Sequence, residues 1–229
     1  MNALSSALSA NEDVKTPTKV GVAANPLSIK SQNGVTSDYV PADIDEYKSI
    51  KWYVLRSTYN RSNKVLTELQ NAGFETYYPK RNVIRRFGVR KVAVKEPYIP
   101  NLIFVNSSRE TIDSFLHQRL SEDRYIKYLL DKTKEREWND KNPPLVVGNH
   151  AMENFRRICD TGNEHVRFIS LEDYSIKSGD TVLVTDGVFK GVEGKYVHVK
   201  GQYRVVIQLS SLGLISTAYV PKAFVRVIR

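Results

Sequence analysis

The positions of hydrophobic residues separate an N-terminal stretch from the rest of the chain. Residues 1–46 show no apolar period and are rich in Ser, Ala, Asn, Thr and Asp, with three prolines. Such a segment cannot bury enough apolar surface to offset the entropy lost on ordering. We therefore predict that residues 1–46 form a disordered leader, either without a role of its own or acting as an arm for a partner.

From residue 47 onward, strand and helix periods alternate. Residues 52–55 are a β-type run, and the apolar positions of residues 65–72 recur at helical spacing. Gly73 follows this helix, where a glycine commonly ends one. Residues 76–78 are a second short strand, and residues 102–105 are continuously apolar, as in a strand buried on both faces.

A hairpin and a second helix complete this pattern. Residues 83–87 and 89–94 flank Gly88 and predict a β-hairpin that carries many Arg and Lys residues. Ser107 and Glu110 have the spacing of a capping box ahead of another apolar helix period. This order of strands and helices predicts an N-terminal α/β sandwich with an antiparallel sheet over residues 47–159.

The end of this first domain is less regular. Residues 121–148 are charged, contain two adjacent prolines and predict a loop-rich stretch. A short helix follows with Asn149 as its N-cap, because apolar side chains then recur at helical spacing. Residues 160–175 are polar and predict an interdomain linker.

From residue 176 the pattern is one of short strands. Val182 and Val184 recur at every second position, as do Val197 and Val199, the apolar residues at 203, 205, 207 and 209, and Val225 and Val227. Glycines separate these runs, and such a series predicts a small closed β-barrel over residues 176–229. The fold class expected for the whole chain is α+β.

Composition and charge narrow the class of function. The 229 residues include 34 basic and 25 acidic side chains, and residues 47–100 alone hold 12 basic against 3 acidic. A localised positive excess favours a polyanionic partner such as nucleic acid, and the alternative is a solvated basic surface without a partner. The chain has one cysteine, no secretory pattern and no apolar run long enough for a membrane helix. We therefore expect a cytoplasmic, nucleoid-associated protein without a membrane contact.

No motif for catalysis emerges. The glycine-rich run of residues 187–195 fails as a phosphate-binding loop, because Phe189 stands where a glycine is needed and Tyr196 where Ser or Thr is needed. The four histidines are scattered without cysteine or carboxylate partners at metal-ligand spacing. We expect no enzymatic activity, no catalytic residues, no metal and no cofactor.

Two motifs in order carry a resemblance to a known family. Gly179, Asp180, Val182, Val184 and the glycines at 187, 191 and 194 resemble the KOW motif of a small SH3-like β-barrel. Residues 52–54, the helix after them and residues 96–105 resemble the N-terminal domain of NusG-type transcription elongation factors. The resemblance covers about residues 50–229.

The resemblance implies partners and site residues. The apolar strand would dock on the clamp helices of the largest catalytic subunit of RNA polymerase, through Tyr98, Ile99, Pro100, Leu102 and Phe104. Tyr98 and Ile99 are expected to be exposed beside two prolines, whereas for Phe104 a place in the core is an equal alternative.

Non-template or upstream DNA is the second implied partner. Basic side chains near the first helix and the hairpin would contact phosphates, and Tyr59 would either stack on an unpaired base or pack at the helix start. The residues are Arg56, Tyr59, Arg61, Lys64, Lys80, Arg81, Arg85, Arg86, Arg90 and Lys91.

The barrel has its own implied partner. Phe189 stands where the family has an exposed loop aromatic that recruits a small-subunit ribosomal protein or a termination factor, and we expect it to be exposed. Nascent RNA is a further option for this domain.

The expected function is that of a monomeric, operon-specific antiterminator. The leader, the basic hairpin and the strand motif, in which Ile99 and Leu102 stand where the family often has aromatics, favour specialised paralogues of the RfaH and UpxY kind. The UpxY-type proteins act on capsular polysaccharide operons. Two alternatives stay open. One is a housekeeping NusG-like elongation or termination factor, and the other is a ribosome- or RNA-associated KOW protein.

Overall fold

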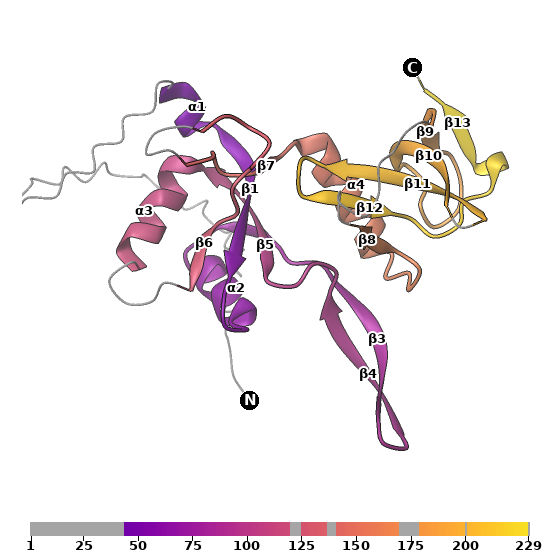
Figure 1. Cartoon of the computed structure of the whole chain (residues 1–229), viewed down its shortest axis with the longest axis horizontal. Coiled ribbons are helices and arrows are strands. Elements are labelled where there is room, and N and C mark those ends of the chain that lie inside the picture. The colour runs from indigo at the N-terminus through magenta and orange to yellow at the C-terminus, as the bar shows by residue number, and fades with distance from the viewer. Residues whose placement is uncertain (1–43, 120–124, 137–140, 170–178, 200, 229) are drawn as a thin grey trace, which may run out of the picture. The chain divides into compact units, whose positions relative to one another are not determined.

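The structure is a computed structural model that describes residues 44–119, 125–136, 141–169, 179–199 and 201–228 (Figure 1). Most of the predicted leader, residues 1–43, lies outside this range. Its last residues do not belong to a leader, because helix α1 (Ile44–Lys48) begins there. Tyr47 on this helix donates a hydrogen bond to the Asp113 carboxylate over 3.1 Å, which ties α1 to the first domain.

An antiparallel sheet forms the centre of the first domain. Its strand order is β2 (Glu75–Tyr77), β5 (Leu102–Ser108), β1 (Ile50–Ser57) and β6 (Ile126–Tyr128). The short strand β7 (Val146–Val147) also pairs with β1. The predicted buried strand is therefore confirmed as β5, which lies between β2 and β1.

The two faces of this sheet are covered by different helices. Side chains alternate across a strand, so odd and even positions of β1 and β5 point to opposite faces. One face packs against α2 (Ser62–Asn71) and α3 (Arg109–Arg119), and it holds Tyr53, Leu55, Ile103 and Val105. The other packs against α4 (Asn149–Asp160), and it holds Trp52, Val54, Leu102 and Phe104.

The helix ends differ in detail from the prediction. Helix α2 ends as expected, because Gly73 follows it with a φ of +83° that favours glycine. Helix α3 is capped by Ser108, whose hydroxyl accepts the Thr111 amide over 3.2 Å, and not by Ser107. Helix α4 starts at Asn149 with Gly148 as its N-cap, so Asn149 is the first helical residue.

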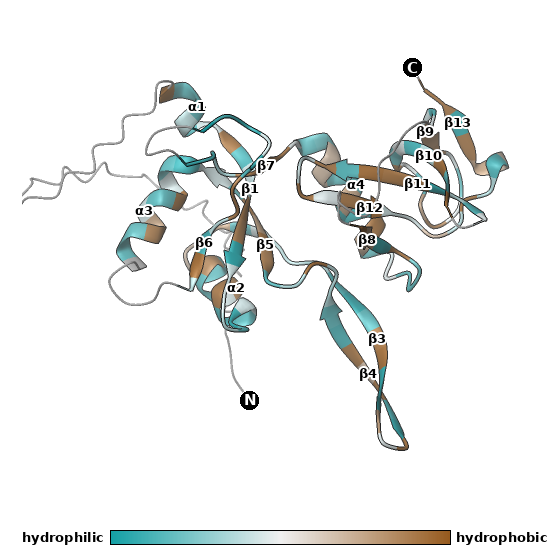
Figure 2. Cartoon of the chain, viewed as in Figure 1, coloured by the Kyte–Doolittle hydropathy of each residue, from teal (hydrophilic) through white to brown (hydrophobic). Residues whose placement is uncertain are grey.

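The predicted basic hairpin is present as a separate two-stranded sheet. Strand β3 (Lys80–Phe87) pairs antiparallel with β4 (Arg90–Pro97) from Lys80↔Pro97 to Phe87↔Arg90. Gly88 adopts a φ of +61° in the turn, a conformation that favours glycine. Apolar and polar bands alternate along the hairpin (Figure 2), and its side chains are exposed or only partly buried.

The C-terminal region is an antiparallel sheet of six strands. Its order is β13 (Val225–Val227), β9 (Thr181–Val184), β10 (Glu193–Val199), β11 (Gln202–Leu209), β12 (Gly213–Ser216) and β8 (Arg167–Ile169), with the 3-10 helix η2 (Lys222–Phe224) before β13. The predicted barrel is not confirmed as closed, because among the described residues β13 and β8 do not pair with each other. Part of the predicted linker belongs to this sheet as β8, and residues 170–178 lie outside the described range.

The first domain and the C-terminal sheet share one hydrophobic core. Buried side chains of β1, β5 and α4 form a continuous cluster with buried side chains of β9, β11 and β12. Hydrogen bonds link the same regions: the Asn154 side chain accepts the Glu193 amide over 2.8 Å, and Ser210 donates to the Val146 carbonyl over 2.6 Å. Ser211 also donates to Asp131 over 2.6 Å. None of the helices described here has the length and apolar character needed to cross a membrane.

Candidate nucleic-acid interface

The loop between β1 and α2 presents an aromatic side chain to solvent. Tyr59 and Asn60 have φ values of +55° and +56°, which non-glycine residues rarely adopt, and Tyr59 is 84% exposed. Consecutive residues in this conformation persist only where the surroundings enforce it. The packing alternative for Tyr59 is therefore not found, and the side chain is available for stacking.

A small hydrogen-bond network holds this loop from beneath. The Ser57 amide donates to the Asn101 carbonyl over 2.9 Å, and the buried Ser57 and Ser62 hydroxyls lie 2.7 Å apart. Ser62 also donates to the Asn101 side chain over 3.3 Å, and the Thr58 amide donates to the Tyr125 carbonyl over 2.8 Å. Residues on both sides of Tyr59 are thus bound to the neighbouring strand ends.

Exposed basic side chains stand on the elements that flank this loop. Arg56 lies opposite Lys127 in the β1–β6 register, and both are exposed. The Arg61 guanidinium and the Lys64 ammonium each lie 5.0 Å from the centre of the Tyr125 ring, at cation–π distance. Of the predicted residues, the structure therefore brings Arg61 and Lys64 together at the Tyr125 ring, whereas Arg56 lies beside Lys127 on the other face of the sheet.

Lys127 is a further basic residue beside Arg56 that the sequence did not reveal. It lies there because β6 pairs with β1, and residues 121–148 were predicted to be loop-rich. An exposed aromatic ring can stack on a base while basic residues on the neighbouring elements contact phosphates. We refer to the loop residue Tyr59 and the exposed basic residues of the flanking elements, Arg56, Arg61, Lys64 and Lys127, as the Tyr59 cluster.

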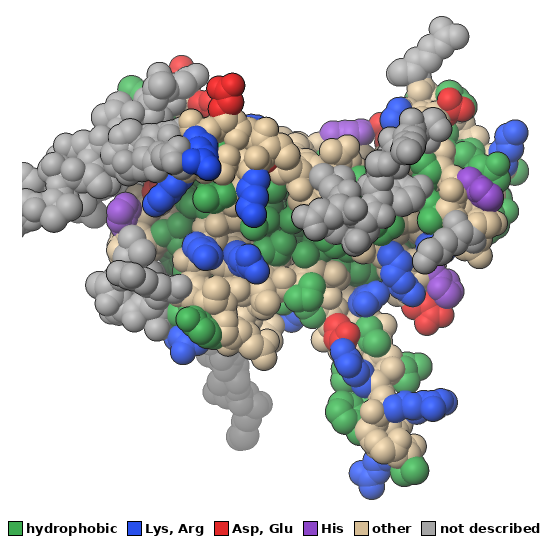
Figure 3. All heavy atoms as spheres, in the orientation of Figure 1, with side chains coloured by type: hydrophobic (Ala, Val, Ile, Leu, Met, Phe, Trp, Pro, Cys, Tyr) green, Lys and Arg blue, Asp and Glu red, His purple; other side chains and the backbone are tan. Residues whose placement is uncertain are grey.

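The predicted hairpin residues form a second basic surface. Arg85, Arg86, Arg90 and Lys91 are all exposed on β3 and β4, and none of them belongs to the Tyr59 cluster. Arg85 donates a hydrogen bond to Glu96 that lowers the pKa of this carboxyl. At the base of the hairpin, Lys80 donates to Asn63 of α2 over 3.0 Å, and Arg81 lies over the Tyr98 ring at 5.8 Å. Figure 3 shows basic and apolar side chains side by side along the hairpin.

The residues expected to dock on polymerase are mostly buried. Tyr98 and Ile99 are 7% and 6% exposed, so their predicted exposure is wrong, and Leu102 is buried as well. Phe104 is fully buried 5.1 Å from the Phe155 ring of α4, which places it in the core. Of the five, Pro100 is exposed. The physical reason is that α4 and the segment after it cover this face of the sheet.

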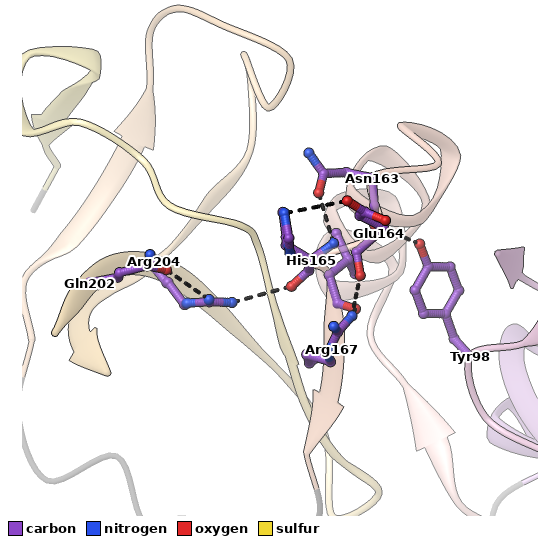
Figure 4. Close-up of polar contacts among 8 residues, drawn as sticks. Tyr98, Asn163, Glu164, His165, Arg167, Gln202 and Arg204 are labelled. Carbon is purple, nitrogen blue, oxygen red and sulfur yellow. Dashed lines mark hydrogen bonds and ion pairs between the residues drawn. The ribbon is translucent and has the colours of Figure 1, made fainter. Parts of the chain in front are cut away.

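Polar contacts connect Tyr98 with the segment that follows α4 (Figure 4). The Tyr98 hydroxyl donates to the Asn163 carbonyl over 3.5 Å, and burial raises the pKa of Tyr98 to about 12, so the phenol stays neutral at physiological pH. Two residues later, the His165 carbonyl accepts a hydrogen bond from Arg204 of β11 over 3.2 Å. The segment thus contacts the first domain and the C-terminal sheet at once.

Phe189 is also inside the core. It is 4% exposed, contrary to the prediction of an exposed loop aromatic. The loop folds back on β9, because the Gly191 amide donates to the Val184 carbonyl over 2.8 Å and the Val192 amide donates to the Phe189 carbonyl over 3.1 Å. The glycine-rich turn therefore directs the ring inward, and Val188 beside it is exposed instead.

The described residues hold no group of three or more His, Cys, Asp or Glu side chains that could bind a metal ion. Cys159 is a buried free thiol, and burial raises its pKa above the usual range.

Comparison with known proteins finds a family that is similar to most of the first domain. Residues 50–147 match the family described as "Transcription termination factor nusG". Among solved structures, one titled "Domain interaction in Thermotoga maritima NusG" is 16% identical, with 79% of this chain and 98% of that chain covered and a TM-score of 0.37. No curated protein matches the chain. The segment that contains the Tyr59 cluster and the basic hairpin is thus similar to the NusG family over residues 50–147.

Proposed function

We propose that this protein is a NusG-like transcription factor that acts on elongation or termination. The observation that carries the proposal is the family match over residues 50–147, which includes β1, α2, the hairpin and β5. The exposed Tyr59 ring and the exposed basic residues of the flanking elements support a nucleic-acid contact within that match. The protein would bind RNA polymerase and nearby DNA and carry out no chemistry of its own.

The mechanism follows from differential affinity. A factor that bridges the polymerase clamp binds the closed clamp better than the open one, so open, paused states become less populated. The Tyr59 cluster would hold an unpaired base of the non-template strand by stacking, while its cations contact the adjacent phosphates. Neither contact reads sequence strongly, which suits a factor that travels with polymerase.

The surface that meets polymerase is part of this proposal. Tyr98, Ile99, Leu102 and Phe104 belong to the core shared with the C-terminal sheet, so a polymerase could reach them only after that core has separated. Pro100 lies at the same strand start and is exposed. We therefore propose Pro100 as the first point of contact with the clamp.

We further propose operon-specific antitermination, by a paralogue of the RfaH and UpxY kind. The basic hairpin and the acidic leader, which holds 6 acidic and 3 basic residues, support a specialised member. A housekeeping NusG-like factor remains the first alternative, with Phe189 in the C-terminal sheet as a contact for a ribosomal protein or termination factor. Because Phe189 is buried, that contact also requires the shared core to open.

The proposal is tested by reconstituted transcription with a purified bacterial RNA polymerase. The full chain should co-elute with the elongation complex and change the lifetime of pauses or the fraction of terminated transcripts. Tyr59→Ala should weaken this effect, whereas Tyr219→Ala, which removes an exposed tyrosine near the C-terminus, should not. Pro100→Asp should lower co-elution without unfolding the chain. Ile99→Asp with Leu102→Asp is unsuitable, because both side chains are buried and the carboxylates would destabilise the domain.

A chain that neither co-elutes with polymerase nor alters pausing would contradict the proposal. Co-purification with ribosomal RNA in place of polymerase would favour the ribosome- or RNA-associated KOW protein. Antitermination at one operon but not at others would separate the specialised factor from the housekeeping one.

A further inference from the structure

The hairpin β3–β4 is a free-standing arm. Its eight residue pairs give it a length of roughly 25 Å at about 3.3 Å per residue. Within the described parts of the chain, no third strand pairs with either of its edges. Isolated two-stranded hairpins are only marginally stable. The stability of the fold therefore does not explain why the chain carries an arm of this length.

The charge of the arm is strongly one-sided. Residues 80–97 hold seven basic side chains and a single acidic one, Glu96, which is engaged by Arg85. Arg86 and Lys91 lie directly opposite each other on one face, and both are exposed. Like charges in such a pair destabilise a hairpin, and a bound anion removes the repulsion.

Apolar side chains occupy the tip of the arm. Phe87 is 63% exposed and Val89 is completely exposed, on either side of Gly88. Ile84, further along β3, is exposed too. These side chains have no core beneath them, so their apolar character serves no packing purpose within the described chain.

Protection of the strand edges does not account for the apolar tip. Charged residues on an exposed edge, Lys in particular, prevent pairing with other chains, but exposed apolar side chains do not serve that purpose. Here nearly all charges are positive and the tip is apolar. This combination complements a polyanion that has an apolar interior.

We propose that the β3–β4 arm binds double-stranded DNA by lying in a groove, with its apolar tip inserted against the base pairs. Arg86, Arg90 and Lys91 contact the phosphates that line the groove, and Phe87 and Val89 partly unstack a base step and bend the duplex. Two-stranded ribbons fit DNA grooves, and apolar wedges flanked by Arg and Lys bend DNA in this way. This inference deepens the proposed function, because it assigns duplex DNA to the arm while the Tyr59 cluster takes unpaired bases.

The first test measures phosphate contacts with the full chain and no polymerase. Binding to a fluorescent duplex of about 20 base pairs, two helical turns, is titrated at several salt concentrations. Arg86→Gln with Lys91→Gln should lower the salt slope by about 2 and weaken binding roughly 60-fold at about 0.1 M salt, because two counterion-releasing contacts are lost. The matched control is Lys190→Gln with Lys222→Gln, which removes the same charge from exposed positions in the turn before β10 and in η2. A salt slope equal to that of the control overturns the proposal.

The second test addresses the apolar tip. Phe87→Ser with Val89→Ser should weaken duplex binding about tenfold at an unchanged salt slope, because apolar burial is lost while phosphate contacts stay. Energy transfer between dyes at the two ends of the duplex should fall as well, because the bend is lost. Val188→Ser with Val227→Ser is the control, since it removes two exposed valines elsewhere. Unchanged affinity and unchanged energy transfer overturn the insertion.

Three further outcomes separate the proposal from its alternatives and from the proposed function. If the tip variant changes the association state of the DNA-free protein and leaves duplex binding intact, the tip binds a second protein chain, and the proposal is wrong. If the arm variants lose single-stranded DNA and Tyr59→Ala loses duplex, the assignment of the two ligands is wrong. Failure of the polymerase assay with intact duplex binding would contradict the proposed function alone, because neither DNA titration contains polymerase.

Discussion

The Tyr59 cluster and the β3–β4 arm both combine an exposed aromatic ring with exposed basic residues, but they are supported in different ways. The loop that carries Tyr59 is bound to the ends of β1, β5 and β6 by buried serine hydroxyls and backbone hydrogen bonds. The arm is held by its own strand pairing and by contacts at its base, where Lys80 reaches Asn63. One surface is fixed by the domain core, and the other depends on a ribbon.

This difference teaches what each surface can recognise. A ring held in a fixed position by its surroundings can stack on a single base without losing much conformational freedom on binding. A narrow ribbon away from the core can enter a groove that the bulk of a domain cannot. Disruption of the core should therefore affect the first surface more than the second.

The largest effect is expected from the core between the sheet and α4. Phe104→Ala should lower the free energy of unfolding by about 3–5 kcal/mol, because a fully buried ring against Phe155 is replaced by a cavity. Ile84→Ala on the arm should change it by less than about 0.5 kcal/mol, because that side chain is exposed. Denaturant titration of both variants measures the contrast. A loss below about 1 kcal/mol for Phe104→Ala would argue for a surface role of Phe104.

An intermediate effect is expected from the support of the Tyr59 loop. Ser62→Ala should lower the free energy of unfolding by about 1–3 kcal/mol, because the buried Ser57 hydroxyl and the Asn101 side chain lose their shared partner. It should also weaken single-stranded DNA binding and leave duplex binding by the arm unchanged. Ser114→Ala, an exposed serine on α3, is the control. Equal losses of both kinds of DNA would show that the two surfaces act as one.

The smallest effect is expected at the strained backbone. Asn60→Gly should raise the free energy of unfolding by less than about 1 kcal/mol, because glycine adopts the φ of +56° without strain but loses more entropy on folding. Single-stranded DNA binding should fall nevertheless, because Tyr59 is held less firmly. Asn82→Gly in the extended strand β3 should instead destabilise the arm. If Asn60→Gly binds single strands as well as the parent, the fixed position of the ring is not what binding requires.

Much of the fold could be predicted from local patterns. Residues 102–105 predict β5, because an unbroken apolar run requires burial on both faces of a sheet. The helical spacing of apolar residues in 65–72 predicts α2. Gly88 between two β-type runs defines the hairpin turn. These elements follow from side-chain period and from the φ range of glycine, both of which are local properties.

Other features depend on contacts distant in the chain. Strands β6 and β7 are short and lie in a charged stretch, and they form because β1 offers them a partner. The inward turn of Phe189 and the burial of Ile99 arise from a core that α4 and the C-terminal sheet complete. Lys127 lies beside Arg56 because β6 pairs with β1, a contact that is also distant in the chain. The candidate site could therefore be predicted only in part. The sequence did not indicate the positive φ of Tyr59, because no glycine stands at that position.

The alkylation rate of the single cysteine can report how often the first domain and the C-terminal sheet separate. Cys159 lies near the end of α4 within the shared core, 3% exposed, with its thiol kept protonated by burial. An alkylating reagent can reach the sulfur only during moments when the core parts, so the labelling rate reports how often that happens. Polymerase or DNA added to the reaction would speed labelling if it favours the parted state, and slow it if it favours the closed one.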